Sequence, residues 1–383
     1  MTDADPPEVS EPVVLKGGKA VEKWKEGKGV WNDWVTKNPV AKIEFSDVDF
    51  GSSSEPYSSQ SFRGFLFGRS GVSFNAVTSK IGDVSFDGAE FGGGDVSFDG
   101  ANFVKSGVSF EEAVFGDCAV SFDNVECSKI TFSPKVIGSG SITACGMKVD
   151  GPAIFRLPPS AKSLKQFDLS GSSFNGPLTL EGDLTTPPDL RSVKAAHHVE
   201  LGKLSVELKR DSIFPFWPLS ELSRLASDRE DAAKLRRLKE IAEANRDHHA
   251  ALRFSADENR ARRWRETPRL ASVLDMIFSG TSNYGQSILR PFVWLCLLGV
   301  IAAMFYRCAA CPAYADCWQA ARLSLSNSLP FLPQSRTLRL DASEALYGET
   351  TSLWVDIVMV VQGTLSFVLL FLIGLGLRNR FRL

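Results

Sequence analysis

The sequence predicts a stack of short parallel strands, a β-solenoid, followed by an α-helical linker and a two-helix transmembrane region. Three observations predict this fold class: an exact repeat between residues 72 and 132, a charged helical stretch after it, and two long apolar segments near the C-terminus. We divide the chain into a disordered tail, a capped solenoid, a charged helical hairpin linker and a membrane region, at residues 1–20, 21–205, 206–285 and 286–383.

The repeat places Val-Ser-Phe every twelve residues, with copies that begin at residues 72, 84, 96, 108 and 120. Val and Phe two residues apart point to one face of a strand, and Asp-Gly pairs after the strand indicate turns. Each copy is too short to bury its own rings, so the repeat predicts stacked units. The predicted ladder of buried rings consists of Phe74, Phe86, Phe91, Phe98, Phe103, Phe110, Phe115 and Phe122.

Charge is concentrated in the repeat region, although the whole chain has a net charge of only −2. Residues 43–133 contain 14 acidic and 5 basic residues, and so carry a net charge of −9. An acidic array could imitate DNA, but negative charge also keeps a solvated face soluble. We favour the second interpretation, because the array is predicted to be attached to a membrane, and we do not expect nucleic acid as a partner.

The N-terminal region is predicted to contain a tail and a cap. The first 15 residues are acidic and contain Pro, with no apolar core of a signal peptide, so we expect them to be disordered and cytoplasmic. Trp24, Trp31 and Trp34 follow within eleven residues. A solenoid needs its terminal unit covered, and three Trp fit that use better than an aromatic ligand cage.

The cap and the repeats resemble bacterial pentapeptide-repeat proteins. The lead-in Trp31–Pro39 is followed by Phe at five-residue spacing, and the triplets 89–91, 101–103 and 113–115 carry the family's Ala and central Phe. The resemblance implies a right-handed parallel β-helix. The twelve-residue period departs from the family pattern, because it is two residues longer than two pentapeptides.

The C-terminal third resembles a bacterial membrane group in which a pentapeptide-like array precedes a helical stretch and two spans. The residues that carry this resemblance are Tyr284–Pro291, Leu325–Phe331, Gln362–Ser366 and Gly376–Arg380. The resemblance implies an architecture and no established activity.

The linker is predicted to be a helical hairpin. A helix is expected after Ser220 as N-cap, with an apolar stripe at helical spacing: Leu222, Leu225, Leu235, Leu238 and Ile241. A turn is expected at residues 245–247, and a second helix from Ala250 to about Trp264.

Two features of the linker invite other interpretations. The pairs His197-His198 and His248-His249 do not predict a metal site, because adjacent residues on a helix point apart and no ligand set is complete. The Arg-rich run 253–269 could bind RNA, but its interleaved acids and the apolar segment that follows favour the positive flank of a membrane span.

Two transmembrane spans are predicted, at about 291–307 and 352–377. The second is long enough by length alone, and Arg290 and Arg307 extend the first. Basic residues precede the first span and follow the second, which places both termini in the cytoplasm. We therefore expect a multi-pass protein of the plasma (inner) membrane.

Polar residues inside the second span are functional candidates by default, and here they are Asp356 and Gln362. The alternative is that Asp356 lies at the headgroup level and Gln362 bonds a neighbouring helix. Two spans with a short helix between them also match a tetrameric pore, although the chain has no Thr-Val-Gly-Tyr-Gly-like filter.

Three cysteines near the first span are disulfide candidates: Cys308, Cys311 and Cys317. A Cys-x-x-Cys pair is also a redox motif, but no βαβ context surrounds this one. Cys127 takes the place of a ladder Phe and is expected to be buried and reduced.

No Walker loop, nucleophile elbow or dinucleotide fingerprint is present. The sequence therefore favours a non-enzymatic, membrane-anchored scaffold without a cofactor. Its expected partners are the lipid bilayer, an unknown protein on the solenoid and a second copy through the transmembrane helices. The alternative is a channel- or transport-related protein with two spans per subunit and a solenoid as its cytoplasmic domain.

Overall fold

The computed structural model describes residues 13–50, 60–79, 82–212, 224–310, 316–329, 332–348 and 350–381. The chain forms two compact units. The first unit is Met1–Asp211 with Ala226–Arg262, and the second is Ser212–Leu225 with Arg263–Leu383. Each unit is described by itself.

The first unit is built from three sheets whose strand pairs are parallel, here called the array. The seven-stranded sheet has the order β1 (Val14–Lys16), β2 (Lys42–Glu44), β5 (Val72–Ser73), β8 (Val96–Ser97), β11 (Ala119–Ser121), β14 (Ser141–Thr143) and β17 (Gln166–Asp168). The four-stranded sheet has the order β13 (Val136–Ile137), β10 (Val114–Phe115), β7 (Glu90–Phe91) and β4 (Leu66–Phe67).

The eleven-stranded sheet contains the remaining strands of the array. These are β3 (Gln60–Ser61), β6 (Val84–Ser85), β9 (Asn102–Ser109), β12 (Glu126–Phe132), β15 (Lys148–Val149), β16 (Ala153–Arg156), β18 (Ser173–Phe174), β19 (Leu178–Leu184), β20 (Lys194–Ala195), β21 (Val199–Glu200) and β22 (Leu204–Val206). A 3₁₀ helix at Pro159–Ser163 interrupts the later strands. Strands β23 (Arg210–Ser212) and β24 (Arg224–Ala226) follow the array along the chain.

Strand neighbours in the regular part of the array are two repeats apart in sequence. Val72 pairs with Val96, and Val96 with Val120, in the seven-stranded sheet. The intervening copy at Val84 pairs instead with Val108, in the eleven-stranded sheet. Successive copies of the repeat therefore alternate between two sheets.

The rings follow the same alternation. Phe98 stacks face to face on Phe74 and on Phe122, with ring centroids 4.9 and 5.1 Å apart. Phe86 stacks on Phe110 at 5.0 Å in a second column, and it meets Phe98 edge to face at 5.2 Å. All eight predicted ladder residues are buried, and they belong to several columns rather than one.

The residue two positions after the Phe of each Val-Ser-Phe copy adopts a left-handed backbone conformation. The positions are twelve residues apart and carry different residue types: Ala76, Gly88, Gly100, Glu112 and Asn124. The turn predicted from the two Asp-Gly pairs is thus kept where Gly is absent, because the paired strands on both sides fix the backbone.

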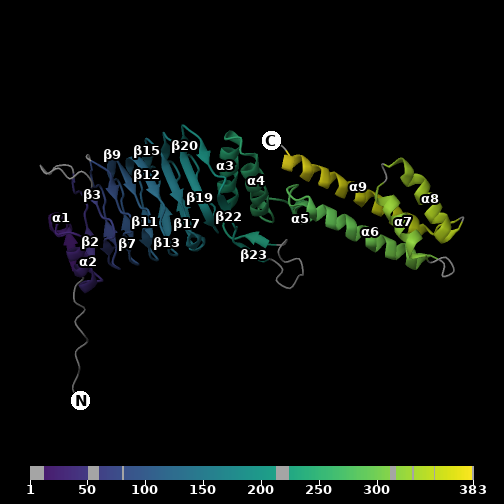
Figure 1. Ribbon diagram of the computed structural model, residues 1–383, viewed down its shortest axis with the longest axis horizontal. Helices are drawn as coiled ribbons and strands as arrows, with labels where there is room; N and C mark the ends of the chain where they lie inside the picture. The colour runs from purple at the N-terminus through teal and green to yellow at the C-terminus, as the bar shows by residue number, and fades with distance from the viewer. Residues whose placement is uncertain are drawn as a thin grey trace, which may run out of the picture. The chain divides into compact units, whose positions relative to one another are not determined.

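Helices close the two ends of the array (Figure 1). At one end lie α1 (Gly18–Lys25) and α2 (Lys28–Lys37). Trp31 of α2 is fully buried, and its Nε1 donates to the Leu66 carbonyl at 2.8 Å. Strand β1 and helix α1 begin inside the stretch that was expected to be a disordered tail; residues 1–12 lie outside the described part of the chain.

The other end is closed by α3 (Asp231–Ala244) and α4 (His248–Arg262), which pack as a hairpin. Arg237 donates to the Val193 carbonyl at 3.0 Å and Asn245 donates to the Val199 carbonyl at 2.7 Å, so the hairpin bonds to the last strands. The expected apolar stripe was too long: Leu225 lies in β24, and the helix begins only at Asp231. Ser220 and Leu222 lie outside the described residues.

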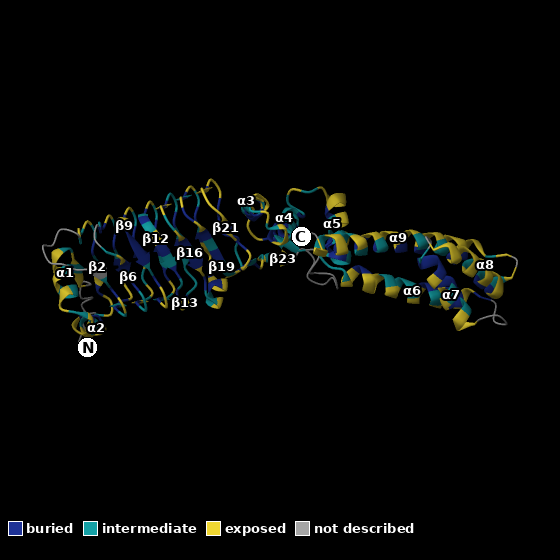
Figure 2. Cartoon of the chain, turned by 45° about the horizontal axis from the view of Figure 1, so that its top comes forward, coloured by how far each residue is buried: buried dark blue, intermediate teal, exposed yellow. Residues whose placement is uncertain are grey.

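The second unit is helical. Its described helices are α5 (Arg269–Ser282), α6 (Leu289–Ala309), α7 (Cys317–Ser328), α8 (Pro333–Tyr347) and α9 (Leu353–Phe381). Helices α6 and α9 contain the two predicted spans, and both are long and apolar enough to cross a membrane. Most of their surface is exposed, unlike the strands of the array (Figure 2).

Candidate functional site

A cluster of polar side chains lies between α6, α7 and α9, around Gln362 of α9. Gln362 is buried, and its Oε1 accepts from the Tyr306 hydroxyl at 2.7 Å and from Asn327 Nδ2 at 3.1 Å. Its Nε2 donates to the Ser324 Oγ at 2.8 Å and to the Ser328 Oγ at 3.0 Å. One amide therefore joins α6, α7 and α9, and both of its ends are satisfied.

The serines of α7 extend this cluster to α6. Ser324 Oγ donates to the Gly299 carbonyl, in the middle of α6, at 2.7 Å. Asn327 uses its second N–H on the Met359 carbonyl of α9 at 2.7 Å, and its Oδ1 lies 3.5 Å from Arg339 Nη1 of α8. Helix α7 is thereby bonded to three neighbouring helices.

The position of the cluster along the spans is informative. Gln362 is the tenth residue of α9, roughly 14 Å from its start at 1.5 Å per residue. Gly299 is the eleventh of the 21 residues of α6. The C-terminal turn of α7 thus bonds to the middle of α6 and to a point about one third of the way along α9, so α7 has the depth of a half-span.

Asp356 does not belong to this cluster. It is exposed in the first turn of α9, where a carboxylate is favoured by the helix dipole, and it accepts from Thr351 Oγ1 at 2.7 Å. The two intramembrane candidates are therefore separate: Gln362 bonds neighbouring helices, and Asp356 lies at a helix end.

The disulfide candidates lie on either side of the loop between α6 and α7. Cys308 is exposed near the end of α6, Cys317 is exposed at the start of α7, and both are free thiols. Cys311 lies outside the described residues. A disulfide among the three stays a prediction.

A second cluster joins the start of α6 to the end of α9. Arg263 is buried, its Nε donates to Asp275 Oδ2 at 2.6 Å, and its Nη2 donates to the Tyr284 hydroxyl at 2.8 Å. Next to Tyr284, the Gly285 carbonyl accepts from Asn379 Nδ2 at 3.0 Å. Gly285 has a positive φ of 74°, and an added Cβ would lie 2.8 Å from Leu375.

The Arg-rich run was expected to be the positive flank of a membrane span, but several of its arginines bond to other parts of the fold. Arg263 is bound inside the second unit, and Arg260 is paired with Asp257 at 2.6 Å. Arg253 donates to the Leu201 carbonyl at 3.3 Å. Several of these arginines hold the fold together, which their spacing in the sequence did not reveal.

Many of the array's carboxylates also have structural partners. Asp87 Oδ1 accepts from the Glu111 N–H at 3.0 Å, and Asp99 Oδ1 accepts from the Asp123 N–H at 3.3 Å and from the Ser121 hydroxyl. The same contact recurs at other acids of the array: Asp83, Asp95, Asp117 and Asp123 accept from the backbone of residues 22 to 24 positions later. Much of the acidic charge thus bonds one strand to the next.

These hydrogen bonds stabilise the charged form of the carboxylates. Bonds from the Ser139 backbone and hydroxyl lower the pKa of Asp117, and the Lys129 ammonium and the Gly107 N–H lower the pKa of Asp83. In contrast, burial raises the pKa of the Cys118 and Cys127 thiols to about 12. Among the described residues, no group of three His, Cys, Asp or Glu side chains is placed to hold a metal ion.

Sequence reasoning selected Gln362 but missed the side chains that bond it: Tyr306, Ser324, Asn327 and Ser328. A signal for three of them is present in Ser324–Ser328, where four of the five residues are polar. Comparison of the chain with protein-family models, with curated proteins and with solved structures gave no match.

Proposed function

We propose that the chain is a membrane-anchored β-solenoid, similar to pentapeptide-repeat proteins, that acts as a cytoplasmic scaffold for a protein partner. The parallel pairing at two-repeat spacing supports the solenoid, because strands that are one turn of a continuous winding apart then lie side by side. The stacked ring columns support it as well, since they fill an interior that no single repeat could form.

The anchor consists of α6 and α9. Their lengths of 21 and 29 residues correspond to about 32 and 44 Å, enough for a hydrocarbon core of about 30 Å. The Gly285–Asn379 contact holds the start of α6 beside the end of α9, so these two ends lie on one side of the membrane. Arg290, Arg378 and Arg380 flank them, which supports a cytoplasmic location for both termini.

The observation that carries the scaffold function is the occupied interior of the array. Rings fill its centre and carboxylates bond successive strands, so the surface available to a partner is the outer face of the sheets. Both ends are covered by helices, which directs binding to these faces. Val104 in β9 and Val136 in β13 are exposed apolar side chains on two different sheets.

Site-specific photocrosslinking in the cells that make the full chain tests this function. A benzophenone side chain replaces Val104 or Val136 on the array, or Phe371 on the exposed side of α9 as a control. We expect a protein adduct of one discrete mass at an array position and none of that mass at Phe371. Adducts at Phe371 alone, with both array positions unreactive, would overturn the scaffold proposal.

A second function, solute or ion passage through the membrane, is supported by α7. A half-span helix bonded between two spans, with Asn327 and Ser328 bonded to the first third of α9, is a type of element from which a pore or transport path can be built. In this function the chain would work as a subunit of an oligomer, with the array as its cytoplasmic domain.

Ion flux into liposomes that contain the purified full chain separates the two functions. Gln362→Leu removes the central amide, and Thr364→Val removes a polar group two residues away that is exposed and bonds only its own helix, at Val360. Selective flux that Gln362→Leu changes and Thr364→Val leaves unchanged supports passage. No flux from well-inserted protein leaves α6 and α9 as an anchor.

A further inference from the structure

Helix α5 buries polar side chains and exposes apolar ones, which is the opposite of a helix on the surface of a water-soluble protein. Its buried residues are Ser272, Ser279 and Ser282. The side chains exposed on it include Leu270 and Leu274, which are 82% and 67% exposed. A helix that faces water buries its apolar side and exposes its polar side.

The exposed apolar side chains form one continuous stripe. Leu270, Val273, Leu274 and Ile277 follow the spacing i, i+3, i+4 and i+7, which places them on a single face of a helix. Arg269, at the first position of the helix, is exposed next to this stripe. Fourteen residues at 1.5 Å per residue give this face a length of roughly 21 Å.

Hydrogen bonds fix which face of α5 points outward. Ser272 Oγ accepts from the Trp264 N–H at 3.2 Å, and Asp275 is bound by Arg263 and by the Tyr284 hydroxyl. Ser282 Oγ accepts from the Gly285 N–H at 3.1 Å. The polar face is therefore attached to the segments before and after the helix, and the apolar stripe cannot rotate inward without breaking these bonds.

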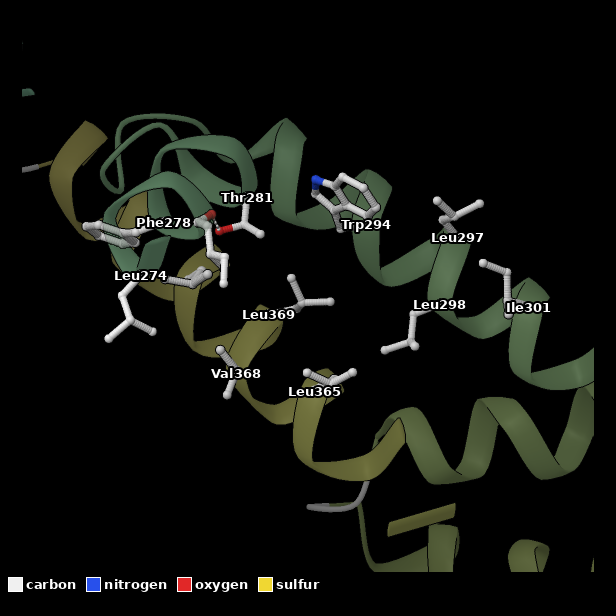
Figure 3. A pocket seen from close by; sticks show the side chains of 12 residues that line it. Leu274, Phe278, Thr281, Trp294, Leu297, Leu298, Ile301, Leu365, Val368 and Leu369 are labelled. Atoms are coloured by element: carbon white, nitrogen blue, oxygen red, sulfur yellow. Dashed lines mark hydrogen bonds between the residues drawn. The ribbon is translucent and has the colours of Figure 1, made fainter. Parts of the chain in front are cut away.

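The stripe is continuous with the outer sides of α6 and α9. Leu274, Ile277, Phe278 and Thr281 form one wall of an apolar groove of about 440 Å³. The other walls are Trp294, Leu297, Leu298 and Ile301 of α6, and Leu365, Val368, Leu369 and Leu372 of α9 (Figure 3). One apolar surface thus extends from α5 onto both spans without a polar boundary.

We infer that α5 lies in the plane of the membrane, with its apolar stripe in the acyl chains of the leaflet that α6 enters. This inference rests on the proposed membrane anchor. The reversed polarity is what an interfacial helix requires when its polar side is held by its own protein, and the exposed Arg269 and Arg290 are placed to meet anionic headgroups.

Lipid fits this surface better than a protein partner. A protein that covered Leu270 and Leu274 would extend along the groove onto α6 and α9, where the spans face acyl chains. A lipid leaflet covers the three helices at once, and flexible chains fill a groove with no polar group except Thr281 and the Trp294 indole N–H.

Photocrosslinking of the full chain in liposomes of phosphatidylethanolamine and phosphatidylglycerol tests the inference. A benzophenone side chain replaces Leu274 on α5, Val300 on the exposed side of α6, or Glu243 on α3, which is exposed in the first unit. All three side chains are exposed, so the substitutions leave the packed interior intact. We expect the intact mass to increase by one phospholipid at Leu274 and at Val300, and no such increase at Glu243.

The outcomes distinguish the inference from the anchor beneath it. Lipid adducts at Val300 without any at Leu274 would overturn the interfacial position of α5 and leave the spans intact. A protein adduct at Leu274, from a second copy or a co-purified chain, would also overturn it. Absence of lipid at both positions would overturn the membrane anchor itself, and the position of α5 with it.

Discussion

The left-handed residues of the array recur every twelve positions although their side chains differ. Gly100 and Ala76 occupy equivalent places, with φ angles of 65° and 53°. At Gly100 an added Cβ would meet no atom within 4 Å, so a substitution there changes only the backbone preference. This pair separates conformational strain from packing.

Exchanging the residue type at these two positions is predicted to have opposite effects. Gly100→Ala should destabilise the array by about 1 kcal/mol, because a Cβ disfavours positive φ. Ala76→Gly should be neutral or stabilising by up to about 1 kcal/mol, since it removes the same strain at the cost of a more flexible unfolded chain. Urea unfolding followed by circular dichroism measures both; equal destabilisation by the two variants would contradict the strained turn.

Cys127 continues a column of the array, paired with Phe103 and Val149 in neighbouring strands. Burial, with the Asp150 charge as a lesser cause, raises the pKa of its thiol to about 12. At pH 8 roughly one thiol in ten thousand would then be ionised, and the thiolate is the reactive form.

We therefore expect iodoacetamide at pH 8 to leave Cys118 and Cys127 unmodified in the folded chain. The exposed Cys308 and Cys317 serve as internal controls and should react, provided that they are reduced beforehand. Peptide mass spectrometry before and after urea unfolding measures the difference. Rapid modification of Cys127 without denaturant would show that its column is open to solvent.

Helix α2 acts at the scale of an element, because it covers the first strands of the array. Trp31 stacks on Phe45 at 5.8 Å and meets Phe65 and Phe67 at 5.7 and 6.0 Å. Its ring thus takes the place that the next layer of Phe would have. An uncovered end exposes both rings and unpaired strand edges.

Removing this ring is predicted to weaken the array from its N-terminal end. Trp31→Ala should cost about 3–5 kcal/mol, as for other buried aromatic residues replaced by Ala, and should promote self-association through the exposed strands. Asp33→Ala, at an exposed position of the same helix, is the matched control and should change stability by less than about 0.5 kcal/mol. Hydrogen exchange locates the loss; uniform exchange across the array would argue against an end effect.

At the scale of the whole molecule, the bonded carboxylates make stability depend on pH. The pKa values of Asp83 and Asp117 are lowered in the folded chain, so the stability that they contribute is present above the ordinary value of 3.8 and is lost as pH falls through the lower folded values. Asp257 acts in the opposite sense, because burial raises its pKa.

The melting temperature of the array should therefore fall steadily as the pH is lowered below about 4. Asp117→Asn removes one contributing charge and should make this dependence shallower. Circular dichroism melts of the full chain in detergent between pH 3 and pH 7 measure it. A melting temperature independent of pH in this range would contradict a structural role for these acids.

Sequence reasoning foresaw the parts of this fold that local patterns determine. The buried Phe residues, the covering Trp residues and the two apolar helices each follow from a short-range signal. The pairing of Val72 with Val96 does not follow from such a signal. The alternation of residues within a strand indicates which side chains are buried, but it does not indicate which strand is the neighbour. The partners of Gln362 were missed for the same reason: Tyr306 is 56 residues away, and no local pattern links the two.

The two-repeat spacing has a consequence for how the array can change length. Each twelve-residue copy belongs to the opposite sheet from the copies before and after it, so the array has a parity. Deleting one copy would transfer every later strand to the other sheet and bring unlike columns into register. Deleting two consecutive copies would preserve every later pairing and shorten the array by one layer, so tandem gain or loss is tolerated only in even numbers of repeats.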